Sequence, residues 1–166
     1  FKRSNLVISA GLVILVITVL VSLAAFNDKS LQYKLMFSPY RAKHHGEWYR
    51  VVTHAFIHKD TMHLFFNMFV LYNFSEIVED RLAFDFKGMG TYYFILLYIG
   101  GFLFATLPSS IKHGDNDSYW SLGASGAVSA VVFAFIIMFP DMKLQLLFIP
   151  IPIPALLFGA LYMGFE

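Results

Sequence analysis

Two long stretches without any charged residue limit what this chain can fold into. Residues 6–26 and residues 122–139 carry no formal charge over 21 and 18 positions. A helix of about 20 apolar residues is long enough to cross the hydrocarbon core of a bilayer. The chain as a whole is 58% hydrophobic and only 14% charged, which is too apolar for an ordinary soluble domain. The sequence therefore predicts an all-α fold, a polytopic membrane bundle of helices.

Three further apolar segments, at residues 62–78, 91–107 and 155–165, complete a set of five predicted membrane helices. They form one predicted transmembrane domain over residues 1–166. The connection at residues 27–60 is too long for a simple turn and contains several Trp and Tyr residues, which favour the lipid headgroup level. We expect it to be a partly embedded interfacial element with structure of its own.

Charge and cysteine content exclude several functions. A net charge of +1 argues against a nucleic-acid partner, and the absence of cysteine excludes a disulfide framework and a thiol nucleophile. The density of Lys and Arg, including Lys2 and Arg3, favours a cytoplasmic N-terminus. In that orientation the helices predicted at 62–78 and 122–139 both begin at the outer face.

The helix predicted at 122–139 begins with an unusual density of small residues. Gly126 and Ala130 have the spacing by which membrane helices pack closely, and Ser125 stands between Ala124 and Gly126. One interpretation is helix packing alone. The other is a reactive hydroxyl near water at the mouth of the helix.

A second polar group lies near the start of the helix predicted at 62–78. His63 and Asn67 are spaced i, i+4 and share one face, and such residues within a span are functional candidates. They could instead form an interhelical hydrogen-bonding pair. A third alternative is a metal site, because His54, His58 and His63 follow one another at intervals of four and five. If the reactive-hydroxyl interpretation holds, Ser125, His63 and Asn67 should converge on one wet pocket.

Four segments together resemble the rhomboid family of intramembrane serine proteases. They are residues 47–54 (EWYRVVTH), 56–58 (FIH), 63–67 (HLFFN) and 123–126 (GASG), in this order and on the expected helices. The turn at residues 79–82 (EDRL) is also similar to the family pattern. The resemblance extends over almost the whole chain and implies a rhomboid-like bundle of six core helices, of which five are present.

The resemblance implies a role for each residue of the candidate site. Ser125 would be the nucleophile that attacks a peptide bond in or near a substrate's transmembrane segment. His63, Asn67 and the backbone N–H of Ser125 would form the oxyanion hole, with Gly123 shaping the tight turn before the serine. The family needs no metal and no other cofactor. The expected partners are a transmembrane protein substrate and the lipid bilayer.

Supporting roles also follow from the resemblance. Glu47 and Arg50 would hold the long first loop, and His58 would be a structural loop histidine. Gly126 belongs to a small face expected to pack against a sixth helix, which in this family carries the general-base histidine. That helix would follow Glu166, so the chain as written is expected to be inactive by itself. The expected location is a bacterial inner membrane, with the site open to the outside.

Two other functions remain as alternatives. The first is a non-catalytic rhomboid-like factor that binds or routes membrane proteins, although such a factor has no need of a nucleophile with oxyanion donors. The second is a small transporter or channel, which would be expected to show intramembrane charges or broken helices in matched halves. The sequence shows neither feature.

Overall fold

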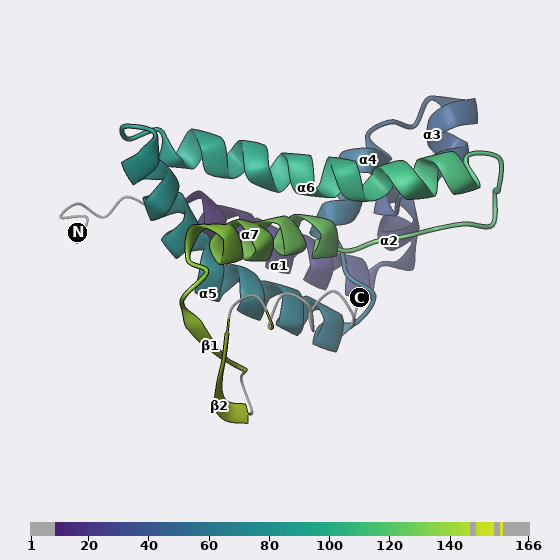
Figure 1. Ribbon diagram of the computed structural model, residues 1–166. Helices are drawn as coiled ribbons and strands as arrows, with labels where there is room; N and C mark the ends of the chain where they lie inside the picture. The colour runs from purple at the N-terminus through teal and green to yellow at the C-terminus, as the bar shows by residue number, and fades with distance from the viewer. Residues whose placement is uncertain (1–8, 147–148, 155–156, 158–166) are drawn as a thin grey trace.

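The computed structural model describes residues 9–146, 149–154 and 157 (Figure 1). Within this part of the chain, four long helices form the bundle: α1 (Ala10–Asn27), α5 (Thr61–Asp85), α6 (Gly90–His113) and α7 (Ser125–Met138). Helix α5 packs against α1, α6 and α7, and α7 packs closely on α6. Helix α5 therefore contacts all three other long helices.

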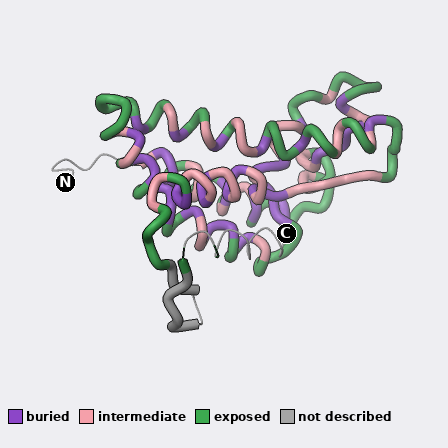
Figure 2. The backbone as a smooth tube through the Cα atoms, in the orientation of Figure 1, coloured by how far each residue is buried: buried purple, intermediate pink, exposed green. Residues whose placement is uncertain are grey.

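Helices α1 and α6 have the length and composition needed to cross a membrane. Only 28% and 22% of their apolar windows are buried in the bundle, so most of each helix faces outward (Figure 2). Their outward side chains include large apolar residues such as Leu20 and Phe104, which are 62% and 73% exposed. Outward faces of this kind suit contact with lipid tails, whereas the core helix of a soluble protein is mostly buried.

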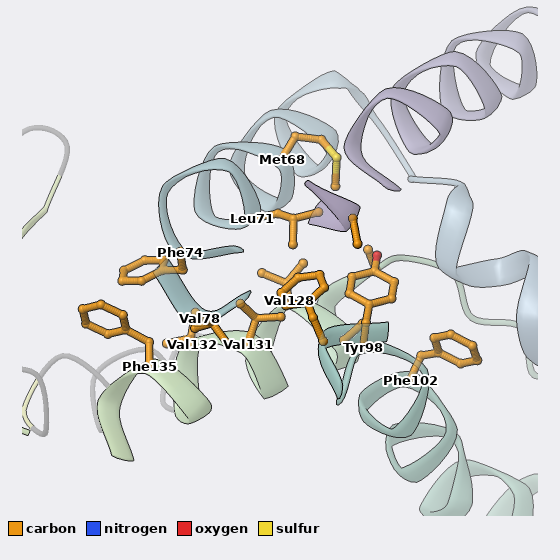
Figure 3. Close-up of a cluster of buried hydrophobic side chains, with 14 of the residues drawn as sticks. Met68, Leu71, Phe74, Val78, Tyr98, Phe102, Val128, Val131, Val132 and Phe135 are labelled. Atoms are coloured by element: carbon orange, nitrogen blue, oxygen red, sulfur yellow. The ribbon is translucent and has the colours of Figure 1, made fainter. Parts of the chain in front are cut away.

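The core lies where α5, α6 and α7 meet (Figure 3). Its side chains recur every three or four positions along each helix, which places them on one face. The aromatic rings of Phe74 and Phe135 meet edge to face with centroids 4.8 Å apart. The labelled core residues are Met68, Leu71, Phe74 and Val78 of α5, Tyr98 and Phe102 of α6, and Val128, Val131, Val132 and Phe135 of α7.

Small residues bring α6 and α7 into close contact. A Cβ atom placed on Gly101 would lie 2.7 Å from Cβ of Ala130, and one on Gly126 would lie 2.4 Å from Cβ of Ala105. Both distances are too short for a real contact, so each crossing point requires glycine. The small face that contains Gly126 and Ala130 was expected to pack against a sixth helix. In the described part of the chain it packs against α6.

The long connection at residues 27–60 contains four short helices. They are α2 (Lys29–Leu35), α3 (Pro39–His45), α4 (Arg50–Thr53) and the 3₁₀ helix η1 (His54–Phe56). They gather around the end of α6 that leads into the loop before α7 (Figure 1). The connection is therefore a folded element and lies close to the start of α7.

Helix α5 continues to Asp85 and α6 continues to His113, beyond the predicted ends at residues 78 and 107. The polar residues at the end of α5 lie within the helix, where Arg81 pairs with Asp85 one turn later. Pro108 lies inside α6. Membrane helices tolerate such a proline when Ser and Thr side chains bond to nearby carbonyl groups, as Thr106 and Ser110 do here.

The two ends of the chain are described only in part. The first predicted span began at residue 6, but helix α1 begins at Ala10, and residues 1–8 lie outside the described part. The all-helical fold class is confirmed for the bundle, and in the connection after α7 the strands β1 (Lys143–Leu146) and β2 (Ile149–Pro154) form an antiparallel hairpin. Alternating prolines in β2 disfavour helix and keep the backbone extended. The span predicted at 155–165 lies outside the described residues except for Leu157.

Candidate active site

Ser125 is the first residue of α7 and follows a tight turn at Gly123. Gly123 has a φ of +125°, in a region of backbone space that residues with a side chain rarely adopt. This backbone conformation is incompatible with helix, which is why α7 begins at Ser125 and not at the predicted residue 122. The turn places the serine at the mouth of an apolar helix.

The segment that leads into this turn is hydrogen-bonded to the long first loop. Phe37 and Ser121 exchange two backbone hydrogen bonds, with N···O distances of 2.9 and 3.0 Å. The backbone N–H of Gly123 donates to the carbonyl oxygen of His54 at 3.0 Å. These bonds join the loop before α7 to the connection between α2 and α3 and to η1. The first loop therefore holds the backbone on which Ser125 is mounted.

His58 adds a side-chain link between the same two regions. Its imidazole is fully buried, and its Nε2 atom accepts from the backbone N–H of Ala124 at 3.5 Å. Its Nδ1 atom lies 3.0 Å from the hydroxyl of Ser22 in α1, which also donates to the carbonyl oxygen of Phe56. Burial, together with the neighbouring His63, lowers the pKa of His58 to about 4, so its ring is neutral at physiological pH.

His63 lies in the first turn of α5, beside the Gly123 turn. Its backbone N–H donates to the side chain of the N-cap residue Asp60 at 2.8 Å. A Cβ atom on Gly123 would lie 2.8 Å from Cε1 of the His63 ring and 3.2 Å from its Nε2. The His58 and His63 rings meet edge to face at 4.9 Å. The structure therefore brings His63 to the turn that precedes Ser125.

Asn67 lies one helical turn after His63, on the same side of α5. It is 7% exposed, and its side-chain Nδ2 donates to the carbonyl oxygen of His63 at 3.0 Å. One further N–H of the carboxamide is available for another acceptor. Among the described residues, its hydrogen bond is to His63 and not to Ser125.

A cavity of about 170 Å³ opens beside Ser125, between the start of α7 and α6. This volume exceeds what a single water needs, and its polar lining can hold water by hydrogen bonds. His63 and Asn67 are not among its lining residues, so the expected single pocket shared by all three side chains is not observed. The polar residues that line the cavity include Ser125, His54, Ser109, Tyr119 and Ser121.

The predicted supporting pair, Glu47 and Arg50, lies at the centre of the first loop. Arg50 is only 3% exposed, and its guanidinium forms an ion pair with Glu47, whose pKa this contact lowers. The Nη1 atom of Arg50 also donates to three backbone carbonyl oxygens around the end of α2, and Trp120 lies over the guanidinium at 5.4 Å. The three carbonyls belong to Tyr33, Lys34 and Met36.

The geometry does not favour the metal alternative at His54, His58 and His63. In the described part of the chain, no cluster of three or more His, Cys, Asp or Glu side chains is arranged to bind a metal ion. Both ring nitrogens of His58 already have protein partners, which leaves neither for a metal.

Sequence reasoning missed Ser22 and the backbone roles of His54 and Ala124. Ser22 lies within an apolar helix and was not singled out, although a polar residue within a predicted span is itself a sign of a functional role. His54 and Ala124 contribute backbone atoms, and the identity of a side chain gives no sign of what its backbone will bond. Gly126, in contrast, has the packing role expected of a small residue, although its partner helix is α6.

Comparison with known proteins identifies the family. The Rhomboid domain matches residues 45–165. The chain is 30% identical to RHOMBOID-like protein 12, mitochondrial, of Arabidopsis thaliana over 169 residues, which cover 93% of this chain and 48% of that protein. It is 30% identical to Presenilin-associated rhomboid-like protein A, mitochondrial, of Danio rerio over 102 residues, covering 61% of this chain and 25% of that one.

A bacterial relative is also similar. Putative rhomboid protease YdcA of Bacillus subtilis is 28% identical over 96 residues, covering 57% of this chain and 44% of that protein. The chain thus spans less than half the length of each of these relatives, and no solved structure matches it. Because the Rhomboid domain matches most of the sequence, and α1 and α6 have outward apolar faces, this membrane protein belongs to the rhomboid family.

Proposed function

We propose that this protein is an intramembrane serine endopeptidase, with Ser125 as the nucleophile. The observation that carries the proposal is the turn at Gly123, which mounts Ser125 at the start of α7 with the His63 ring against it. Within the described residues, no protein group hydrogen-bonds the Ser125 hydroxyl, so it is available for reaction. The cavity beside it offers room for the water that hydrolysis consumes.

The proposed reaction follows acyl-transfer chemistry. The Ser125 oxygen attacks the peptide carbonyl carbon while a general base takes the hydroxyl proton, because a neutral serine hydroxyl is a weak nucleophile. The negative charge that develops on the carbonyl oxygen needs donors fixed beforehand. We assign this role to the backbone N–H of Ser125 and the side chains of His63 and Asn67. Collapse of the tetrahedral intermediate breaks the peptide C–N bond, and the base gives its proton to the departing amine. Water then attacks the acyl-enzyme and loses a proton to the base, which returns it to the Ser125 oxygen as the new carboxylic acid is released.

The general base is assigned to a histidine on the sixth core helix of the rhomboid fold. This assignment rests on the resemblance to the family. Near the Gly123 turn, both nitrogens of His58 have protein partners and His63 is assigned as an oxyanion donor.

The substrate is proposed to be another membrane protein, cut in or near its transmembrane segment. The proposed location is a bacterial inner membrane, with the N-terminus in the cytoplasm and Ser125 toward the outside. Because the chain has no cysteine, single cysteines can report this orientation directly. A cysteine at Asp117, in the loop before α7, should react with a membrane-impermeant maleimide added to intact cells. Protection of that cysteine in intact cells would overturn the orientation.

The test of the activity is cleavage of a transmembrane substrate by protein expressed from its complete gene in liposomes. Ser125→Ala should abolish cleavage without changing the melting temperature. Ser110→Ala is the matched control, because the Ser110 hydroxyl only donates within its own helix to the carbonyl oxygen of Thr106. Equal cleavage by the two variants would remove Ser125 from the role of nucleophile, and no cleavage by the unmodified protein would favour a non-catalytic function.

The oxyanion assignment is tested separately with His63→Ala and Asn67→Ala. Loss of one oxyanion donor should slow cleavage by about 10- to 1000-fold. The rate should be measured per folded molecule, since both side chains also lie in the bundle. If these variants only lower the yield of folded protein, the two residues have a structural role.

A further inference from the structure

Ser22 lies far from Ser125 in sequence, yet its hydroxyl belongs to the network around the Gly123 turn. The side chain is fully buried in α1. Its oxygen lies 3.0 Å from the carbonyl oxygen of Phe56 and 3.0 Å from Nδ1 of His58. A serine hydroxyl has one proton to donate, and a carbonyl oxygen can only accept. The Ser22 proton therefore points to Phe56.

This assignment determines where the proton of the His58 ring lies. With its own proton on Phe56, the Ser22 oxygen can only accept from His58, so Nδ1 carries the imidazole proton. A neutral imidazole has one N–H, which makes Nε2 an acceptor. Nε2 is the atom that the backbone N–H of Ala124 approaches. The opposite tautomer would set two N–H groups against each other and leave Nδ1 of His58 without a donor.

We propose that Ser22 is a positioning residue of the Ser125 site, which acts by holding His58 in the Nδ1–H tautomer that accepts from the Ala124 backbone. The peptide group between Gly123 and Ala124 is planar, so fixing the Ala124 N–H also fixes the direction of the Gly123 carbonyl. Ser125 is the next residue. The inference rests on the proposed role of Ser125 and adds a residue from α1 to that site.

The tautomer can be observed without any measurement of activity. Nitrogen-15 NMR of histidine-labelled protein distinguishes Nδ1–H from Nε2–H, and the His58→Asn spectrum assigns the signals. In the unmodified protein His58 should carry its proton on Nδ1 at neutral pH. A proton on Nε2 would overturn the proposal at once.

Two variants of equal shape separate the hydroxyl from packing. Ser22→Thr and Ser22→Val both add bulk to a buried site, but only threonine keeps an oxygen. Ser22→Thr should retain the Nδ1–H signal of His58, whereas Ser22→Val should lose it. Ser22→Ala, which adds no bulk, should also lose it. Retention of the signal in both Ser22→Val and Ser22→Ala would overturn the proposal.

The same variants should change the rate of substrate cleavage per folded molecule. Displacing a reacting group by 1 Å can cost about 100-fold, so we expect a loss of about 10-fold in Ser22→Ala and Ser22→Val relative to Ser22→Thr. Ser75→Ala is the matched control, because Ser75 is also a buried serine but lies against Gly11 in α1. Equal rates for Ser22→Thr and Ser22→Val would overturn the proposal.

These outcomes are distinct from failure of the proposed function. If Ser125→Ala retains cleavage, the proposed nucleophile is wrong, and the NMR experiment still decides whether Ser22 sets the tautomer of His58. If Ser125→Ala abolishes cleavage but Ser22→Ala cleaves at the normal rate, the protease assignment stands and Ser22 has no positioning role.

Discussion

The two ends of α5 both contain buried polar groups, but they satisfy them in different ways. At the end near Asp85, Glu79 is 1% exposed and accepts from the backbone N–H of Ala10 at 2.9 Å and from the Thr91 hydroxyl at 2.5 Å. A Cβ atom on Gly90 would lie 2.3 Å from the Glu79 carbonyl oxygen. Contacts between helices therefore close this end of the bundle.

At the end near Thr61, the backbone polar groups just before Ser125 are bonded by loop residues and not by neighbouring long helices. The backbone before Ser125 bonds to Phe37, His54 and His58, all of which lie in the connection between α1 and α5. Among the described residues, the Ser125 hydroxyl has no hydrogen bond. The comparison indicates that contacts between helices stabilise one end of α5, while the other end holds the serine proposed as the nucleophile.

The largest expected effect on this comparison comes from Gly123→Ala at the site end. Alanine would have to adopt a positive φ at this position, and its Cβ would meet the His63 ring. The turn before Ser125 should therefore shift. A shift of about 1 Å predicts a loss of about 100-fold in the cleavage rate. Gly46→Ala is the control, because Gly46 also has a positive φ, +71°, but nothing within 4 Å of the added atom.

The control should separate backbone strain from damage to the site. Gly46→Ala is expected to cost about 1–2 kcal/mol of stability and to leave the rate per folded molecule unchanged. Melting curves and initial rates measure the two effects. Equal rate losses in both variants would show that the Gly123 turn has no special relation to the site.

The second prediction addresses the closed end. Glu79→Ala leaves the Ala10 N–H and the Thr91 hydroxyl without this acceptor, which should lower the free energy of unfolding by about 2–4 kcal/mol. The rate per folded molecule should change little. Glu76→Ala on the exposed side of the same helix should leave stability nearly unchanged. If Glu79→Ala lost turnover at normal stability, the end of α5 near Asp85 would not have the purely stabilising role assigned to it.

The smallest effect is expected along α6, between the two ends. Gly101→Ala pushes a methyl group into α7 and should destabilise the bundle by about 1–3 kcal/mol. Gly100→Ala meets nothing within 4 Å and should be neutral or stabilising by up to about 1 kcal/mol, because alanine favours helix. Thermal unfolding in detergent micelles compares the pair. Equal melting temperatures would show that α6 and α7 do not require a glycine at this crossing.

The sequence predicted the helical bundle and the positions of Ser125, His63 and Asn67 on their helices. Apolar runs and i, i+4 spacing are local properties, and a chain read in order reveals them. The ends of the helices were harder to predict, because polar residues such as Glu79 and Asp85 usually signal a turn. Here Glu79 finds acceptable partners inside the bundle, which only the packed structure reveals.

The network before Ser125 could not be predicted from the sequence for a different reason. The bonds from Gly123 to His54 and from Ser121 to Phe37 join backbone atoms that lie 69 and 84 positions apart in the chain. Backbone groups are the same in every residue, so no residue pattern marks them. Ser22 is the exception, since its hydroxyl in an apolar helix is visible in the sequence.

The most direct test of the central claim is to locate the residue that reacts with a fluorophosphonate. The protein expressed from its complete gene should be incubated with the probe in liposomes, and the modified peptide identified by mass spectrometry. The proposed role of Ser125 predicts a single adduct on that residue and none after Ser125→Ala. An adduct on another serine, or equal labelling of the Ser125→Ala variant, would contradict it.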